Sequence, residues 1–139
     1  MGMEVQLSLA LPRDRSTVPL TRRVLDAALA VFAVTKDCRD DISLAVGEAC
    51  ANAVEHAEVG ADYHVTVTIV DDRCVIDVVD EGTGVELTDT PEPGPYDEAG
   101  RGLRIIRALA DAVELRRDQH RGVGLRIIKV LTRSRPAPA

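Results

Sequence analysis

The chain has 139 residues, and its 17 basic and 23 acidic residues give a formal net charge of −6. This length fits one domain, and a hydrophobic content of 45% can build a core, which excludes wholesale disorder. The acidic surplus and an aromatic content of 2% argue against a nucleic-acid partner, which would need a basic field or exposed rings for stacking. No apolar run reaches the roughly 18 residues of a membrane span.

The N-terminal and cysteine patterns favour a reducing, cytoplasmic setting. The first residues lack the basic and apolar regions of a secretory signal. The three cysteines, Cys38, Cys50 and Cys74, are an odd number and form no C-x-x-C motif. We therefore expect neither a disulfide framework nor a zinc site, and we expect the thiols to serve as small apolar core groups.

The first half of the chain predicts one strand followed by two helices. Alternating apolar residues predict a strand over 4–11, and apolar residues at helical spacing predict a helix over 20–34. A second helix is expected to be capped by Asp37, to run to about Glu58 and to stop at Gly60.

The second half predicts a hairpin, a long acidic connection with three prolines, a helix and two strands, over 64–70, 73–80, 85–99, 100–112, 113–117 and 124–131. This order predicts an α+β fold, a two-layer sandwich with helices on one face of a mostly antiparallel, mixed sheet. We expect a single domain over 1–132 and a Pro-rich, disordered tail over 133–139.

The first segment that could carry chemistry lies on the second predicted helix. Glu48 and Asn52 are one turn apart and share a helix face beside the apolar stripe. A carboxylate and an amide oxygen at this spacing can bind Mg²⁺, and the carboxylate can act as a general base on a hydroxyl. The alternative is an ordinary solvated helix face.

The second segment is Asp-Glu-Gly-Thr-Gly, which follows the strand over 73–80 directly. Asp80 falls on the core-facing side of that strand, so its carboxylate needs a donor, such as an exocyclic amine. Gly82 and Gly84 let the backbone turn sharply and approach a ligand. The alternative is a glycine turn that Asp80 caps.

The third segment is Gly-Arg-Gly-Leu at 100–103, which opens a predicted helix. Free N–H groups at a helix start favour phosphate oxygens, and Arg101 and Arg104 add positive charge. The alternative is a flexible hinge into an amphipathic helix.

Together, the three segments resemble the N, G1 and G2 boxes of the GHKL, or Bergerat-fold, ATPases. The stretches 48–57 and 100–111 are most similar to those of bacterial anti-sigma-factor serine/threonine kinases. The resemblance runs from the first strand to Leu131. It implies a Bergerat ATP-binding fold, with ATP and Mg²⁺ as cofactors.

The resemblance also implies a role for each site residue. Glu48 would be the catalytic general base on a serine or threonine hydroxyl, Asn52 would hold Mg²⁺ against the ATP phosphates, and Asp80 would accept the adenine amine. The stretch 85–99 would form a lid over the nucleotide. Further nucleotide contacts would come from Gly82, Gly84, Gly100, Arg101, Gly102 and Leu103.

The implied function is that of an anti-sigma factor with protein kinase activity. Its partners would be a sigma factor and a STAS-type anti-anti-sigma protein, which it would phosphorylate, and relatives tend to form homodimers. Arg22 and Arg23 lie where relatives contact partner proteins, although an ordinary solvated helix face also explains them.

One departure keeps two alternatives open. Some relatives carry a basic residue before the G2 glycines, where this chain has Asp97, Glu98 and Ala99. Charge on the γ-phosphate must then come from Arg101, from Arg104 or from a partner chain. The alternatives are a nucleotide-gated binding module without phosphotransfer and a detached histidine-kinase-type catalytic domain.

Overall fold

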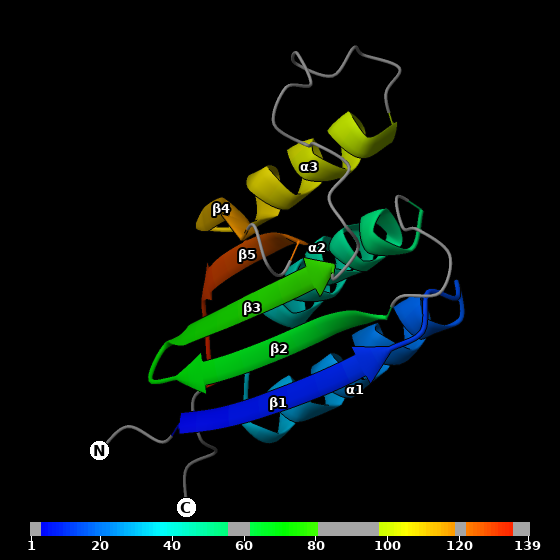
Figure 1. Ribbon diagram of the computed structural model, residues 1–139. Helices are drawn as coiled ribbons and strands as arrows, with labels where there is room; N and C mark the ends of the chain where they lie inside the picture. The colour runs from blue at the N-terminus through cyan, green and yellow to red at the C-terminus, as the bar shows by residue number, and fades with distance from the viewer. Residues whose placement is uncertain (1–3, 56–61, 81–97, 119–121, 135–139) are drawn as a thin grey trace, which may run out of the picture.

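In the computed structural model, helices pack against one face of an antiparallel sheet (Figure 1). The structure describes residues 4–55, 62–80, 98–118 and 122–134. In these ranges the elements are β1 (Glu4–Leu11), α1 (Thr17–Val31), α2 (Lys36–Glu55), β2 (Tyr63–Val70), β3 (Arg73–Asp80), α3 (Glu98–Leu109), β4 (Ala112–Asp118) and β5 (Gly122–Val130). The predicted two-layer α+β fold is confirmed.

The sheet has the strand order β1-β2-β3-β5-β4, and all four pairings are antiparallel. Alternate side chains of β2 and β3 are buried, as expected for a sheet with helices on one face. None of the described helices is both long enough and apolar enough to cross a bilayer.

The register brings three residues into one row at the end of the sheet where the site lies. Leu11 of β1 pairs with Tyr63 of β2, and Tyr63 pairs with Asp80 of β3. Leu11 and Tyr63 are buried, so Asp80 lies on the helix-facing side, as its place in the alternation predicts.

The helix α1 begins at Thr17, three residues before the predicted start. The added turn contains the buried Thr17, and a second threonine, Thr21, is buried one turn later. The sequence does not reveal this burial, because both residues are polar. Thr17 Oγ1 lies 2.6 Å from the Asp14 carbonyl and 2.6 Å from the Tyr63 hydroxyl, and Thr21 Oγ1 lies 2.8 Å from the Thr17 carbonyl. Since the single Thr17 hydroxyl proton is donated to Asp14, Tyr63 is the donor to Thr17.

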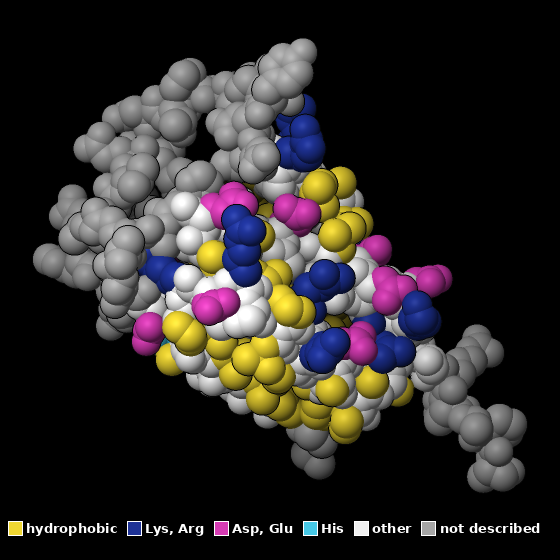
Figure 2. Space-filling view, turned by 90° about the vertical axis from the view of Figure 1, so that its right-hand side faces the viewer, with side chains coloured by type: hydrophobic (Ala, Val, Ile, Leu, Met, Phe, Trp, Pro, Cys, Tyr) yellow, Lys and Arg dark blue, Asp and Glu magenta, His cyan; other side chains and the backbone are white. Residues whose placement is uncertain are grey.

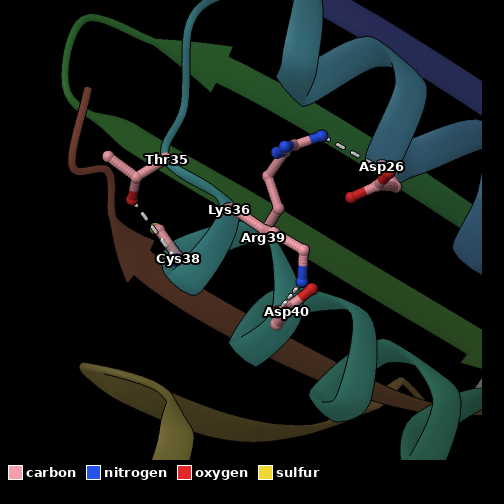
Figure 3. A network of polar contacts seen from close by, with 6 residues as sticks. All are labelled: Asp26, Thr35, Lys36, Cys38, Arg39 and Asp40. Carbon is pink, nitrogen blue, oxygen red and sulfur yellow. Dashed lines mark hydrogen bonds and ion pairs between the residues drawn. The ribbon is translucent and has the colours of Figure 1, made fainter. Parts of the chain in front are cut away.

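The start of α2 corrects another expectation. The cap is Thr35, whose hydroxyl oxygen accepts from the Cys38 backbone N–H at 3.4 Å, and not Asp37, which lies within the first turn (Figure 3). In the same network, Arg39 of α2 reaches Asp26 of α1 at 3.5 Å. This contact helps to fix α2 against α1.

The C-terminal end of α3 is fixed to β5. Lys129 Nζ donates to the Leu109 carbonyl at 2.6 Å, which satisfies one of the open carbonyls at the helix end. The Asp111 carboxylate accepts from the Val130 N–H at 2.7 Å. These contacts hold α3 in place beside α2 (Figure 1).

The chain beyond β5 continues to pair through Ser134. Arg133 forms an isolated bridge with Val34, and the Ser134 N–H donates to the Ala33 carbonyl at 2.8 Å. The expected tail over 133–139 therefore has its first two residues fixed, while 135–139 lie outside the described residues.

The buried thiols of Cys50 and Cys74 are expected to make the free energy of unfolding depend on pH. Burial raises the pKa of Cys50 and that of Cys74 from 9.0 to about 12. Because the folded-state pKa is raised, this contribution to the free energy of unfolding is fully present below pH 9 and is lost as the pH rises toward 12. We expect iodoacetamide at pH 8 to label both thiols in urea but not in the native protein, as followed by mass spectrometry. Labelling of the native protein at the rate of a free thiol would contradict this prediction.

Candidate functional site

The site is centred on the place where Gly102 of α3 meets α2. A Cβ atom at Gly102 would lie 3.2 Å from Glu48 Oε2, 3.3 Å from Asn52 Nδ2 and 3.4 Å from Asn52 Oδ1. The structure therefore brings together two segments that are about 50 residues apart in the sequence, and the polar ends of Glu48 and Asn52 converge there.

The local sequence explains this convergence. Ala45, Ala49 and Ala53 are buried on the inner face of α2 and let it approach the sheet and α3 closely. Glu48 and Asn52 flank this stripe, one turn apart, and each is only partly buried. Their side chains therefore keep polar atoms accessible at the edge of the core.

The main contribution of Gly102 to the site is the space that its missing side chain leaves, and not a free backbone N–H. The helix α3 begins at Glu98, two residues earlier than predicted, so Gly100 lies in the first turn. Its N–H belongs to the open first turn, whereas Gly102 lies deeper, where backbone N–H groups bond within the helix. A side chain at Gly102 would occupy the space beside Glu48 and Asn52.

Asp80 stands at the end of β3 and is held by an arginine that the sequence analysis missed. Arg13 Nη2 donates to Asp80 Oδ1. The Arg13 side chain is 7% exposed and the Asp80 side chain 22% exposed, so this ion pair is largely removed from water. Only the strand register could have revealed it, because Arg13 lies 67 residues before Asp80.

The other predicted nucleotide contacts divide into two groups. Arg101 and Arg104 are exposed on α3 and can reach an anion, and Leu103 is partly buried. Gly82, Gly84 and the lid up to residue 97 lie outside the described residues.

The two arginines of the expected partner surface lie exposed on α1. Arg22 lies across α2, where its Cδ would be 3.1 Å from a Cβ placed on Gly47, and its Nε donates to Ser43 at 3.2 Å. Since Gly47 precedes Glu48 directly, Arg22 connects the surface of α1 to the helix that carries the candidate base. Arg23, the next residue on α1, is exposed to solvent.

The net charge of −6 does not form a single-sign surface on the face shown in Figure 2. Basic and acidic side chains are interspersed there among hydrophobic ones. A polyanion would find no continuous basic field on this face. Positive charge for a small anion is instead available locally, from Arg101 and Arg104.

Replacing Gly102 by alanine tests the close approach of the two helices. The added methyl group must displace the Glu48 and Asn52 side-chain ends by a few tenths of an ångström, while alanine improves helix propensity by about 1 kcal/mol. We expect the free energy of unfolding to change by less than about 1 kcal/mol and catalysis of any reaction at this site to fall about tenfold.

The matched control is Gly124→Ala in β5, where the new methyl group meets Val79 Cγ2 at 3.6 Å, an ordinary van der Waals distance. This variant should keep its activity. Full activity in the Gly102→Ala variant would show that the spacing of Glu48 and Asn52 from α3 is unimportant.

Comparison with known proteins agrees with this arrangement. Residues 11–129 match the family model for the histidine kinase-like ATPase domain. The chain is 31% identical to the serine-protein kinase RsbW of Halalkalibacterium halodurans, over 91% of this chain and 84% of the relative. It is 33% identical to RsbW of Listeria monocytogenes, over 84% of this chain and 83% of the relative.

Solved structures share the fold. A crystal structure of the RsbU and RsbW domains of a Mycobacterium tuberculosis protein matches 93% of this chain and 32% of that longer chain, with a TM-score of 0.72 and 20% identity. The SiaB–SiaC complex of Pseudomonas aeruginosa contains a chain that matches with a TM-score of 0.64 and 15% identity, over 89% of this chain and 88% of that one. The chain therefore belongs to the histidine kinase-like ATPase family and, within it, to the group of RsbW serine-protein kinases.

Proposed function

We propose that the protein is an ATP-dependent serine/threonine kinase that also acts as an anti-sigma factor. Its substrate would be a STAS-type anti-anti-sigma protein, and its second partner a sigma factor. The observation that carries this proposal is the meeting of Glu48, Asn52 and Gly102 between α2 and α3, in a member of the RsbW group.

Glu48 is the candidate general base. A serine or threonine hydroxyl is a weak nucleophile and needs a base within hydrogen-bond reach. The Glu48 carboxylate is partly buried and lies at the edge of the core, where it can accept a proton from a hydroxyl that enters beside Gly102. A phosphohistidine kinase would not need this group, because a histidine ring is already nucleophilic.

The oxygen atoms that converge at Gly102 fit a divalent cation. Mg²⁺ prefers oxygen ligands and usually takes only one or two from the protein, with the rest from phosphates and water. Asn52 Oδ1 would be the protein ligand, and the ion would neutralise charge on the phosphates of ATP. In the described ranges no three His, Cys, Asp or Glu side chains gather into a metal cluster, so a site shared with the nucleotide is the arrangement we propose.

The nucleotide is oriented by groups at both ends. Asp80 would accept the adenine amine, and Arg101 and Arg104 would face the phosphates with Gly100, while Gly82, Gly84 and Leu103 complete the proposed contacts. These arginines lie on the helix that carries Gly102, so positive charge and the candidate base approach the phosphates from α3 and α2. This arrangement stabilises the charge of the transferred group.

Partner binding would use α1, through Arg22 and Arg23, in a cytoplasmic homodimer. Phosphorylation would add charge to the anti-anti-sigma protein at the interface and release it, which would free the kinase for the sigma factor. Exchange between two protein partners would thus depend on one phosphoryl transfer.

The deciding experiment is phosphoryl transfer from radiolabelled ATP to candidate STAS proteins encoded in the same genome. We expect label on a single serine or threonine, identified by mass spectrometry, and loss of the complex after transfer. ATP binding by calorimetry, with no transfer to any candidate, would instead favour a nucleotide-gated binding module.

A further inference from the structure

The contact between Arg13 and Asp80 assigns a function to a residue outside the expected boxes. On the basis of the nucleotide site proposed above, we propose that Arg13 is a positioning residue for the adenine base. It fixes the Asp80 carboxylate so that the carboxylate accepts the exocyclic amine of adenine.

The strand register places Arg13 where it can do this. Leu11, Tyr63 and Asp80 form one row across β1, β2 and β3, and Arg13 follows Leu11 by two residues. Its side chain reaches from the end of β1 past β2 to the end of β3, where its Nη2 donates to Asp80 Oδ1.

The loop that carries Arg13 is held on both sides. The Asp14 N–H donates to the Pro12 carbonyl at 2.8 Å, and the Thr17 N–H donates to the Asp14 carbonyl at 2.9 Å. The Thr17 hydroxyl is anchored in turn to the buried Tyr63 hydroxyl at 2.6 Å. Arg13 thus extends from a rigid loop whose anchor is the strand residue paired with Asp80.

The burial of Arg13 indicates whether it positions Asp80 for adenine or competes with adenine for Asp80. The Arg13 side chain is 7% exposed, so breaking its contact with Asp80 would separate two opposite charges that are largely removed from water, which is costly in proteins. A hydrogen bond from an adenine amine to a carboxylate is worth less than such a buried charge pair. The base therefore binds with Arg13 in place.

The chemistry allows both contacts at once. A carboxylate has two oxygens and about four lone-pair directions, and Arg13 Nη2 contacts Oδ1. A guanidinium that holds one oxygen fixes the plane of the carboxylate, which leaves the carboxylate aligned as an acceptor for a second donor. Adenine carries such a donor at its 6-amino group, whereas purine riboside lacks it.

The test compares two nucleotides that differ in this amine alone. Calorimetry with Mg²⁺ would give the Kd of ATP and of purine riboside triphosphate for the wild type, Arg13→Gln, Arg13→Lys and Arg15→Gln. Arg15 is the matched control, since it is exposed in the same loop. A general loss of structure weakens both nucleotides equally, so the ratio of the two Kd values reports on the base contact.

We expect the wild type and Arg15→Gln to prefer ATP. Arg13→Gln should weaken the binding of ATP about tenfold and the binding of purine riboside triphosphate less than twofold, which removes most of the preference for ATP. Arg13→Lys keeps the charge but cannot fix the carboxylate plane, and should lose about threefold of the preference. If Arg13→Gln does not fold, the Arg13→Lys ratio decides.

Two results would overturn the inference while leaving the proposed function intact. One is an unchanged preference for ATP in Arg13→Gln, or in Arg13→Lys if that variant alone folds. Another is tighter ATP binding by Arg13→Gln, which would show that Arg13 competes with the base. If the wild type does not bind ATP at all, the proposed function itself fails.

Discussion

Substitution of Glu48 by glutamine is expected to lower phosphoryl transfer to the partner protein by about 10²- to 10⁴-fold, the usual contribution of a general base. Glutamine has nearly the same shape and still accepts hydrogen bonds, but it does not take up a proton at neutral pH. ATP affinity should change by less than about twofold, which is small beside the tenfold step expected for a lost polar contact. Transfer is measured with radiolabelled ATP in single-turnover assays, and affinity by calorimetry.

The matched control is Glu55→Gln. Glu55 lies on the same helix, seven residues along and on nearly the same face, and it is exposed. We expect its transfer rate to equal that of the wild type. Equal rates in the Glu48→Gln variant as well would remove Glu48 from the chemistry, even if ATP still bound.

The second large effect is expected from Asp80→Asn. The substitution removes the charged acceptor for the adenine amine, and hydrogen bonds to charged groups are worth about 1.5–3 kcal/mol, so ATP affinity should fall about 10- to 100-fold. It also removes the negative charge that Arg13 contacts at Asp80. Because Asp80 is 22% exposed, we expect the free energy of unfolding to fall by on the order of 2 kcal/mol, less than for a fully buried pair.

Asp77→Asn is a strict control for this change. Asp77 lies on the same strand but on the other face of the sheet, where it forms a two-pronged ion pair with Arg126 at 2.7 and 3.2 Å. The control therefore removes a carboxylate paired with an arginine without touching the site. Calorimetry should show wild-type ATP affinity in Asp77→Asn, and urea unfolding gives the free energy of unfolding of both variants. An equal loss of affinity in both variants would place the adenine contact elsewhere.

Local patterns in the sequence were sufficient to place all five strands, and for β1 and β3 they were also sufficient for both ends. The bounds of β1 and β3 were predicted correctly, because one face of each strand is apolar and a two-residue turn at Asp71 and Asp72 ends the preceding strand. The start of α1 was missed for the opposite reason. Thr17 is buried through partners that include Tyr63, 46 residues away, and no local pattern reveals such a partner.

The same distinction applies to the site. The spacing of Glu48 and Asn52 was visible on one helix, and the structure adds that both meet Gly102. The partner of Asp80 was not visible, because it depends on the register of three strands at once. The sequence suggested only that Asp80 requires a donor, and in the structure Arg13 donates to it.

The hairpin formed by β2 and β3 determines on which face of the sheet Asp80 lies. Its turn leaves Val70 opposite Arg73, with Asp71 in the left-handed region at a φ of 52°, which aspartate tolerates better than most residues. Asp80 lies seven residues after Arg73, about 24 Å along β3 at about 3.4 Å per residue, and this count places its side chain on the helix-facing side of the sheet. One residue more or fewer within β3 would turn that carboxylate to the opposite face. The turn at the far end of this hairpin thus sets the side of the sheet on which Asp80 can hold the adenine base.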